Sequence, residues 1–328
     1  MTRRFRNALE GAAGLAAGAT ACAAAANAVL SRRAAPLPPA IDAEQGRYDW
    51  DGGAVSYSVA GRGKPIVLLH SHNAAASTYE MKQAFQRLKD GYRVFAPDLP
   101  GYGRSERRHR EYFAHTYIRF LHDFVSDVVG APAIVVAASL SASHAILAAA
   151  EDPGAFSHLV LASPTGISDE SADAPEAMRR LSAIARVPVW GQAAFNALAS
   201  KASIRWFYEN RVYDNPWAVT HEMVDYAWLS AHQPRALYAP ASFLNGNLWG
   251  DPRAALASIT APALLIWGAG DRLNPYAQAA SSLPVRESLR VHLMPECGGA
   301  AYDEKADEFA AVVRAFLAEH GAPPETEG

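Results

Sequence analysis

Short apolar runs alternate with helical patterns along most of this chain, and that alternation limits the fold more than any other feature. The runs are mostly continuous and lie at 65–70, 92–97, 133–138, 158–163, 263–268 and 289–294. Such runs are typical of parallel strands that helices cover on both faces. Helical patterns are expected at 76–89, 113–129, 140–151, 275–282 and 303–319. The alternation predicts a doubly wound α/β sheet.

One further strand differs from these runs. The segment "VSYSVA" at 55–60 alternates apolar and polar residues at period two, with Gly52, Gly53 and Gly61 at the turns. This pattern predicts an antiparallel strand at the edge of the sheet.

A long segment without strand pattern interrupts the alternation between "LASPTG" and "PALLIWG". It carries three helical patterns, "EAMRRLSAIARV", "QAAFNALASKASIRWFYENRVY" and "THEMVDYAWLSAHQ". We therefore expect a helical cap at 165–257 over a core formed by 41–164 and 258–322. Its aromatic residues are more often packing than ligand contacts, yet a lid is also where a substrate pocket would form.

The first forty residues form a separate segment of different composition. An Arg-rich start precedes twenty uncharged, mostly Ala residues at 11–30, and "AAPLPPA" follows as a stiff, extended linker. Three interpretations remain open: a secretory signal with a site at Ala26-Asn27-Ala28, a membrane anchor with weak hydropathy, or an Ala-rich helix on the domain or at a surface. Membrane association through 11–30 and the cellular location are left open.

Charge and cysteine content exclude several classes of function. Thirty Lys plus Arg oppose 33 Asp plus Glu, so the formal charge is −3, and no basic face for nucleic acid is expected. Cys22 and Cys297 support neither a disulfide framework nor a cysteine metal site. No His pair has convincing metal-ligand spacing, and no dinucleotide fingerprint follows a strand. We predict neither a metal nor a cofactor.

The segment "VVAASLSASHAILAAA" carries the strongest chemical signal. A buried strand enters a small-x-Ser-x-small sequence centred on Ser139 and leaves as an Ala-rich helix. Ala137 and Ser141 are small enough for the sharp turn of a nucleophile elbow, and the Leu140 N–H would lie at a helix N-terminus beside developing negative charge. A serine that merely caps the helix, or a register that makes Ser141 the nucleophile, are the alternatives.

These motifs together resemble the α/β-hydrolase superfamily, in the branch with a helical cap after the sixth strand. "PIVLLHSHNAAASTYE" is similar to the family's His-Gly loop, and "YRVFAPDLPGYGRSER" to its Asp-x-x-Gly-x-Gly-x-Ser loop at Asp98, Gly101, Gly103 and Ser105. "LLIWGAGDRLNP" is similar to the strand and turn that carry the catalytic acid. The resemblance implies a mostly parallel eight-stranded sheet flanked by helices.

The resemblance also implies roles for particular residues. Ser139 matches the nucleophile, Asp271 matches the acid that orients an imidazole, and Leu140 matches one oxyanion donor. His72 occupies the loop position whose backbone N–H would be the second oxyanion donor, although Ser71 replaces the customary Gly.

The family's histidine is missing from its usual position. In "CGGAAYDEKADEF" Gly298, Glu304 and Phe309 match the family pattern without a gap, and the histidine position is Gly299. Without its base a catalytic triad loses on the order of a million-fold in turnover. His72 is the best candidate for a displaced base, because its loop borders the nucleophile. His70, His144, His221, His232 and His292 are weaker candidates.

Two functions fit this pattern. The first is an esterase-like serine hydrolase of a small acyl or ester substrate with an incomplete triad. The second is a degenerate member that binds a small apolar ligand or a protein partner without turnover, because a fold does not dictate its chemistry. A halide-displacing enzyme is a weaker option, since it would need a carboxylate at Ser139.

Overall fold

The core of the protein is an eight-stranded sheet in a computed structural model that describes residues 3–168, 176 and 187–325. The spatial order is β1-β2-β4-β3-β5-β6-β7-β8, and every pairing from β4 to β8 is parallel. The strands are β1 (Glu44–Trp50), β2 (Gly53–Ala60), β3 (Pro65–Leu69), β4 (Arg93–Pro97), β5 (Ala133–Ala138), β6 (Phe156–Ala162), β7 (Ala263–Gly268) and β8 (Leu289–Met294). The predicted mostly parallel eight-stranded sheet is confirmed.

The edges of the sheet differ from the prediction. The segment at 55–60 does form antiparallel β2, but β1 pairs outside it and is the true edge strand. β1 has the sequence EQGRYDW, whose mainly polar residues give no apolar run. At the other edge β8 is largely exposed, with Val291 39% and Leu293 43% accessible, so its apolar run does not lie between two layers of helices.

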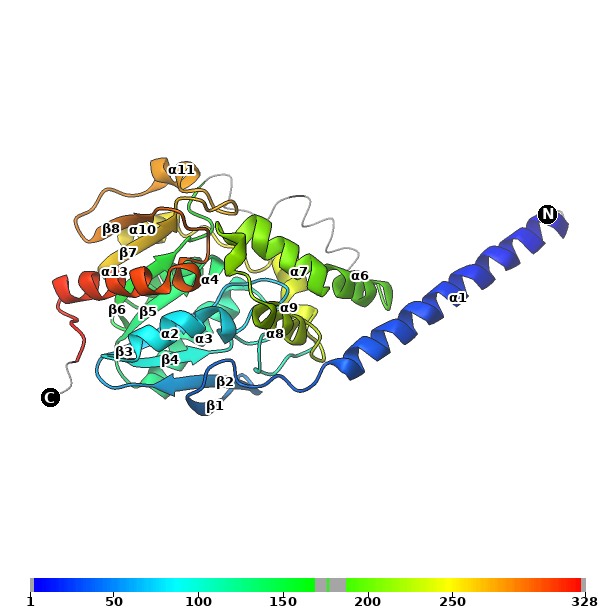
Figure 1. Ribbon diagram of the computed structural model, residues 1–328, viewed down its shortest axis with the longest axis horizontal. Coiled ribbons are helices and arrows are strands. Elements are labelled where there is room, and N and C mark those ends of the chain that lie inside the picture. The colour runs from blue at the N-terminus through cyan, green and yellow to red at the C-terminus, as the bar shows by residue number, and fades with distance from the viewer. Residues whose placement is uncertain (1–2, 169–175, 177–186, 326–328) are drawn as a thin grey trace.

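Helices cover both faces of the sheet, as predicted (Figure 1). Side chains of α2 and α13 share one buried cluster with the sheet, and those of α3, α4 and α10 share the other. The helices are α2 (Lys82–Leu88), after a 3₁₀ turn η1 (Thr78–Met81); α3 (Ala114–Phe124), which continues into a π-turn η2 (Val125–Val129); α4 (Leu140–Glu151); α10 (Arg253–Ser258); α11 (Tyr276–Ala279), followed by η6 (Ala280–Ser282); α12 (Ala301–Glu304); and α13 (Ala306–Glu319).

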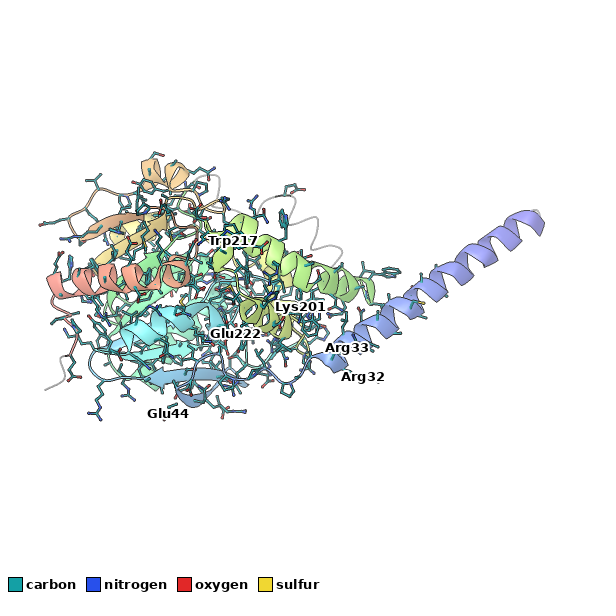
Figure 2. All side chains as sticks on the ribbon, in the orientation of Figure 1. Arg32, Arg33, Glu44, Lys201, Trp217 and Glu222 are labelled. Atoms are coloured by element: carbon teal, nitrogen blue, oxygen red, sulfur yellow. The ribbon has the colours of Figure 1, made fainter. Side chains whose placement is uncertain are left out.

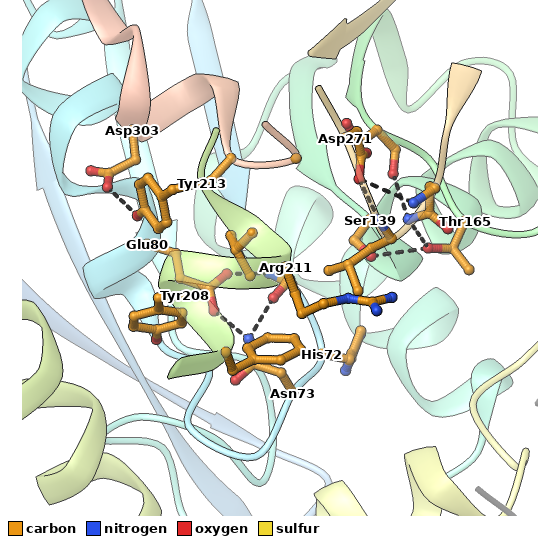
Figure 3. A pocket seen from close by; sticks show the side chains of 18 of the residues that line it. His72, Asn73, Glu80, Ser139, Thr165, Tyr208, Arg211, Tyr213, Asp271 and Asp303 are labelled. Carbon is orange, nitrogen blue, oxygen red and sulfur yellow. Dashed lines mark hydrogen bonds between the residues drawn. The ribbon is translucent and has the colours of Figure 1, made fainter. Parts of the chain in front are cut away.

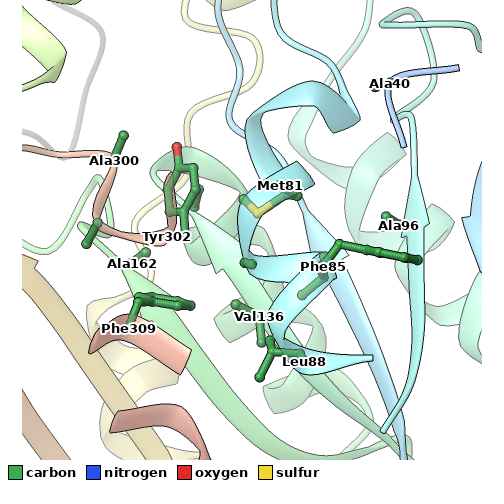
Figure 4. Packing of buried hydrophobic residues seen from close by; sticks show 14 of the residues in the cluster. Ala40, Met81, Phe85, Leu88, Ala96, Val136, Ala162, Ala300, Tyr302 and Phe309 are labelled. Carbon is green, nitrogen blue, oxygen red and sulfur yellow. The ribbon is translucent and has the colours of Figure 1, made fainter. Parts of the chain in front are cut away.

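Apolar side chains from distant segments meet beneath α2 (Figure 4). Phe85 and Leu88 of α2 pack with Val136 of β5, and Phe309 of α13 closes the same cluster. All four side chains are fully buried. Burying such a side chain contributes roughly 1.5–3 kcal/mol. This packing between α2, α13 and β5 fixes the position of the strand whose carboxyl end precedes Ser139.

The Asp-x-x-Gly-x-Gly-x-Ser loop is a structural clamp. Asp98 Oδ1 accepts the Thr78 N–H at 2.7 Å, and Oδ2 accepts the Arg104 N–H at 2.8 Å. Ser105 closes the loop by donating to the Asp98 carbonyl. Gly103 has φ +50°, and a Cβ there would lie 2.0 Å from Asp98 Oδ1, so only glycine fits. The motif fixes the backbone beside the sheet.

A helical insertion separates β6 from β7. Its described helices are α6 (Trp190–Leu198), α7 (Lys201–Phe207), the π-turn η4 (Tyr208–Val212), the 3₁₀ turn η5 (Pro216–Ala218), α8 (His221–Ala231) and α9 (Tyr238–Leu244). These helices occur where the cap at 165–257 was predicted. The predicted helical pattern "EAMRRLSAIARV" lies almost wholly outside the described residues, of which it includes only 176 and 187.

The Ala-rich segment is a single helix, α1 (Arg3–Arg33), that projects from the body of the protein (Figures 1 and 2). Near its inner end Asn27 Nδ2 donates to the Val189 carbonyl at 2.9 Å, and Asn27 Oδ1 accepts from Asn196 Nδ2 at 2.9 Å. The helix is therefore fastened to the insertion. Across the described residues, no helix combines the length and hydropathy that crossing a membrane requires.

The Pro-rich segment after α1 is not a free linker. Leu37 and Ala40 are both buried, and Ile41 is fully buried. The Pro38 carbonyl accepts a hydrogen bond from Tyr226 Oη at 2.8 Å. The predicted linker role is therefore wrong for this segment, because its apolar side chains join the core and its backbone is tied to α8.

The two cysteines differ in environment. Cys22 is an exposed thiol on α1, whereas Cys297 is buried after β8. Burial raises the pKa of the Cys297 thiol to about 12. Both thiols are free.

Candidate active site

Ser139 lies on a strained turn between β5 and α4. Its φ of 52° and ψ of −121° are uncommon for a residue other than glycine, and such conformations cost roughly 1–3 kcal/mol. The turn is held because the Ser139 N–H donates to the Ala162 carbonyl at 2.9 Å and the Thr165 N–H donates to the Ser139 carbonyl at 3.2 Å. Strain of this kind is typical of a nucleophile elbow.

The two alternatives for this serine are excluded by their side-chain contacts. Ser139 occupies the N-cap position of α4, but its side chain makes no capping hydrogen bond, so its hydroxyl does not serve to cap the helix. Ser141 is 1% exposed, and its hydroxyl donates to the His70 carbonyl at 2.6 Å. Ser141 is therefore a structural residue.

The Ser139 side chain borders a pocket of about 400 Å³ (Figure 3). The sheet side contributes Asp271, Gly299 and the loop at 71–73, and the insertion contributes residues from η4, α8 and α9. The lining from the insertion is Phe207, Tyr208, Arg211, Val212, Tyr213, Met223, Phe243 and Trp249. Most of these side chains are apolar, which suits a small organic ligand.

Ser139 is hydrogen-bonded to a hydroxyl and not to a base. Its Oγ lies 3.0 Å from Thr165 Oγ1, which also accepts a hydrogen bond from Asn274 Nδ2 at 3.0 Å. Neither Thr165 nor Asn274 was predicted from the sequence. Their positions offered a signal, because Thr165 follows β6 and Asn274 follows β7 at the same edge of the sheet as Ser139.

The Asp271 carboxylate is buried in the same pocket, with 5% of its surface exposed. Its Oδ1 accepts the Leu273 N–H at 2.8 Å and the Asn274 N–H at 3.0 Å. Its Oδ2 accepts no hydrogen bond from the described residues. Burial raises the pKa of this carboxyl, and the two backbone amides and the neighbouring Ser163 hydroxyl oppose that change, although Ser163 Oγ makes no hydrogen bond within the described residues. Asp271 therefore has one fixed oxygen and one that lacks a partner.

Gly299 lies beside that carboxylate. A Cβ atom at position 299 would be 3.2 Å from Asp271 Oδ1 and 3.3 Å from Oδ2. The φ of Gly299 is outside the left-handed region, so the backbone would accept a residue with a side chain. A side chain at position 299 would thus start at the Asp271 carboxylate, where an imidazole of a triad would be expected.

The turn that carries Gly299 is firmly held. The Gly299 N–H donates to the Val212 carbonyl at 2.8 Å. The Glu304 carboxylate accepts the Gly298 N–H at 2.7 Å and the Asn215 N–H at 2.7 Å. Position 299 is therefore fixed against the insertion even though it carries no side chain.

His72 is not in hydrogen-bond contact with Ser139. Its ring is packed edge-on against Tyr117 at 4.5 Å, His144 at 5.1 Å and Tyr102 at 5.3 Å between ring centroids. Neither ring nitrogen has a hydrogen-bond partner among the described residues. Burial lowers the pKa of His72 well below its usual value, so the ring is neutral. The expectation that His72 replaces the missing base is not met, because these rings enclose it.

Three of the other histidines that the sequence offered have structural contacts of their own. His70 Nε2 accepts the Leu99 N–H at 3.0 Å, and His144 Nε2 lies 2.8 Å from the Leu248 carbonyl. His232 Nδ1 lies 2.8 Å from the Trp228 carbonyl. All eleven histidines fall within the described part of the chain, and none of them hydrogen-bonds to Ser139.

The predicted oxyanion donors come from two loops at the pocket. Leu140 is the first residue of α4, so its N–H is one of the donors that the helix leaves unpaired. His72 follows Ser71, whose N–H donates to Glu80 Oε2 at 2.8 Å. Asn73 Nδ2 also donates to Glu80, to Oε1 at 2.8 Å. Glu80, which the sequence search missed, therefore anchors this loop.

Charged groups line the side of the pocket farther from Ser139. Asp303 Oδ2 accepts a hydrogen bond from Tyr213 Oη at 2.5 Å. Burial raises the pKa of Asp303 to about 6; the Glu80 carboxylate adds to the increase and Tyr213 opposes it. Within the residues described, no cluster of His, Cys, Asp and Glu side chains is suited to hold a metal ion.

A strained serine after β5, a buried aspartate after β7 and helices inserted between β6 and β7 define the architecture of an α/β hydrolase. The chain belongs to the alpha/beta hydrolase family, whose model matches residues 66–312.

Several known proteins are similar to most of this chain at low sequence identity. A 2-hydroxy-6-oxo-6-phenylhexa-2,4-dienoate hydrolase of Comamonas testosteroni is 25% identical over 279 residues, which cover 80% of this chain and 91% of that protein. The crystal structure of a serine hydrolase involved in carbazole degradation matches with a TM-score of 0.69 and 20% identity, over 85% of this chain and all of the other. A thermophilic esterase of Thermogutta terrifontis matches with a TM-score of 0.68 and 16% identity, over 85% and 99%.

Proposed function

We propose that this protein is an esterase-like serine hydrolase of small acyl compounds that lacks its general base at position 299. The observation that carries the proposal is the strained Ser139 turn, which borders the same pocket as the buried Asp271 carboxylate and Gly299. The helices of the insertion act as a cap over this pocket. The family membership and the esterases and dienoate hydrolases among similar proteins support this reaction class.

The chemistry follows from the position of each group. Ser139 Oγ attacks the acyl carbon, and the N–H groups of Leu140 and His72 stabilise the negative charge on the carbonyl oxygen. Such donors and substrate binding alone leave roughly 10³ to 10⁴ of rate acceleration over water when a triad base is missing. Asp271 would orient an imidazole and stabilise its charge. We therefore expect slow acylation of Ser139 in the protein alone.

Arg211 favours acyl compounds that also carry a carboxylate. Its guanidinium reaches the pocket beside Ser139 (Figure 3) and hydrogen-bonds to the Arg272 carbonyl at 3.3 Å. No carboxylate of the described residues forms an ion pair with it. Arginine binds carboxylates in a bidentate manner, so a free carboxylate on the substrate would satisfy Arg211.

Labelling with a fluorophosphonate probe tests the proposal. Purified protein should react slowly at Ser139, and Ser139→Ala should abolish the label. Ser258→Ala, which changes an exposed serine outside the pocket, should label like the wild type. Hydrolysis of p-nitrophenyl acetate and of the p-nitrophenyl hemiester of succinate should then reveal the preference for a carboxylate. Label that persists in Ser139→Ala would refute the assignment of the nucleophile.

Binding without turnover is the second candidate function. It is favoured by the single observation that Ser139 has Thr165 and no imidazole as its partner. A protein that binds an acyl compound in equilibrium dialysis, but forms no label and releases no product over days, would support this function and contradict the first.

A further inference from the structure

The pocket wall beside Gly299 carries a carboxylate oxygen, Asp271 Oδ2, that accepts no hydrogen bond from the described residues. Asp271 is 5% exposed. A buried carboxylate oxygen that accepts no hydrogen bond is costly, because its lost hydration is not replaced. Oδ2 belongs to the pocket lining, so a ligand that carries a donor can supply the missing hydrogen bond.

The turn at position 299 is fixed beside this part of the pocket. Gly299 and Gly298 are tied to Val212 and Glu304 by hydrogen bonds of 2.8 and 2.7 Å. The turn is thus held by Val212 of the insertion and by Glu304 of α12. A Cβ at position 299 would lie 3.2 Å from Asp271 Oδ1 and 3.3 Å from Oδ2, which is a tight contact, so the room for a ligand lies in the pocket that both residues line and not directly between them.

The neighbouring groups restrict the chemistry of the ligand. An N–H is needed toward Asp271, and an unprotonated nitrogen is needed to take the proton of Ser139. A primary amine has a pKa near 10 and is protonated at neutral pH, so it offers no such acceptor. An imidazole has a pKa of about 6.5 and carries a donor and an acceptor on the two sides of one ring.

We propose that the part of the pocket lined by Gly299, Asp271 and Ser139 is a subsite for an imidazole ring supplied by a ligand, which then acts as the general base toward Ser139. The catalytic part of this inference rests on the proposed function, whereas the binding part does not. The ring can belong to the acyl substrate itself or to a free small molecule, and both sources present the same chemistry to Asp271.

The proton transfers balance without any further reagent. The ring nitrogen takes the proton of Ser139 as Oγ bonds to the acyl carbon, and the imidazolium then gives that proton to the departing alkoxide. The neutral ring next takes a proton from water as the hydroxide attacks the acyl-serine. The imidazolium returns that proton to Ser139 Oγ, the acid is released and the ring is neutral again.

Binding is tested first, in a protein that cannot turn over. Saturation-transfer NMR should detect imidazole bound to Ser139→Ala. The signal should be lost in Ser139→Ala/Gly299→Val, which fills the subsite, and in Ser139→Ala/Asp271→Asn, which removes one acceptor oxygen. Circular dichroism and urea unfolding show whether each variant is folded. Folded variants that still bind imidazole, or an Ser139→Ala protein that does not, would overturn the subsite.

Rescue of chemistry is tested with the wild type. Saturating imidazole should raise the rate of fluorophosphonate labelling on the order of 100-fold, the lower end of what a positioned general base contributes. 1-Methylimidazole accepts a proton but has no N–H for Asp271, so it should stimulate far less. Equal stimulation by both compounds would overturn the role of Asp271, and no stimulation by either would overturn the role of the ring as a general base.

A pair of esters distinguishes the two sources of the ring. The p-nitrophenyl esters of 3-(imidazol-4-yl)propanoic acid and 3-phenylpropanoic acid are compared, after subtraction of the Ser139→Ala rate. Faster hydrolysis of the imidazole ester alone supports a ring carried by the substrate, and stimulation of the phenyl ester by free imidazole supports a free base. Bound imidazole with no labelling and no hydrolysis would leave the subsite standing and refute the proposed function.

Discussion

The turns after β5 and β7 differ sharply from the turn after β8. The first two keep side chains that suit chemistry: Ser139 with its strained backbone and Asp271 with its buried carboxylate. The third carries Gly299 at the corresponding edge and has polar side chains that point to the insertion. Asp303 contacts Tyr213, and Glu304 holds the backbone at Asn215.

This difference shows that the segment after β8 has a structural role, which is to hold the insertion against the core. Hydrogen bonds from Asp303 and Glu304 join the β8 side of the core to the insertion and do not depend on a side chain at position 299. The architecture of the pocket therefore does not depend on a side chain at position 299.

The largest expected effect comes from placing an imidazole side chain at position 299. Gly299→His should raise ester hydrolysis by about 10²- to 10⁴-fold, which is the usual contribution of a positioned base. The ring would start beside Asp271, whose carboxylate must move by a few tenths of an ångström. Turnover of p-nitrophenyl acetate measures the gain.

The matched control for this variant is Gly299→His/Asp271→Asn. It keeps the imidazole but removes the group that orients it, so most of the gain should disappear. An unchanged rate in a folded Gly299→His protein would show that the β5 and β7 turns have also lost their catalytic geometry.

Glu304→Ala should produce the next largest effect, on stability. It leaves the buried Gly298 N–H without its acceptor, at a cost of about 2 kcal/mol in the free energy of unfolding. Urea unfolding measures this, and Glu308→Ala, an exposed glutamate on α13, is the control and should change little. Equal losses in the two variants would mean that the β8 turn does not depend on Glu304.

Asp303 should make stability depend on pH. Its pKa is raised from 3.8 to about 6 on folding, so the folded state binds this proton more tightly than the unfolded state. The resulting stabilisation is fully present below about pH 3.8 and is lost as the pH rises through about 6. Asp303→Asn should remove that loss, of about 1 kcal/mol after allowance for partial exposure.

Urea unfolding of wild type and Asp303→Asn at several pH values between 4 and 7 tests this sign. Asp307→Asn is the control, because the Arg87 guanidinium lowers the pKa of Asp307 and its pH dependence has the opposite sign. The prediction would be contradicted if the free energy of unfolding of the wild type increased from pH 4 to pH 7 and Asp303→Asn removed that increase.

The smallest effect is expected at the partner of the nucleophile. Thr165→Val removes the hydroxyl 3.0 Å from Ser139 Oγ, and the rate of fluorophosphonate labelling should rise about threefold, as the loss of one competing hydrogen bond allows. Thr165→Ser keeps the hydroxyl and should label like the wild type. A large loss of labelling in Thr165→Val would instead assign Thr165 a part in positioning Ser139.

The sequence predicted the parts of the fold that depend on local pattern. Helix 140–151 and strands 133–138, 263–268 and 289–294 begin and end where they were expected. β1 was missed because its residues are mainly polar and give no apolar run, although the strand pairs with β2 along its length. The segment at 34–40 was misjudged because proline content indicates stiffness but not the surface on which Leu37 packs.

The site was predicted less completely than the fold. Ser139 and Asp271 follow strands whose carboxyl ends meet, so their shared pocket could be expected from topology. The enclosure of His72 depends on Tyr102, Tyr117 and His144, which come from three separate segments. Such packing between distant residues has no signature in sequence spacing, and the same is true of the hydrogen bond between Ser139 and Thr165.

Because one thiol is exposed and the other is buried, a thiol reagent should modify Cys22 selectively. Alkylating reagents attack thiolates. Cys22 is exposed, whereas Cys297 is buried and has a pKa of about 12. A maleimide dye should thus attach at one point, on α1, far from the nucleophile. The motion of this projecting helix could then be followed by fluorescence anisotropy in a native chain that needs no engineered cysteine.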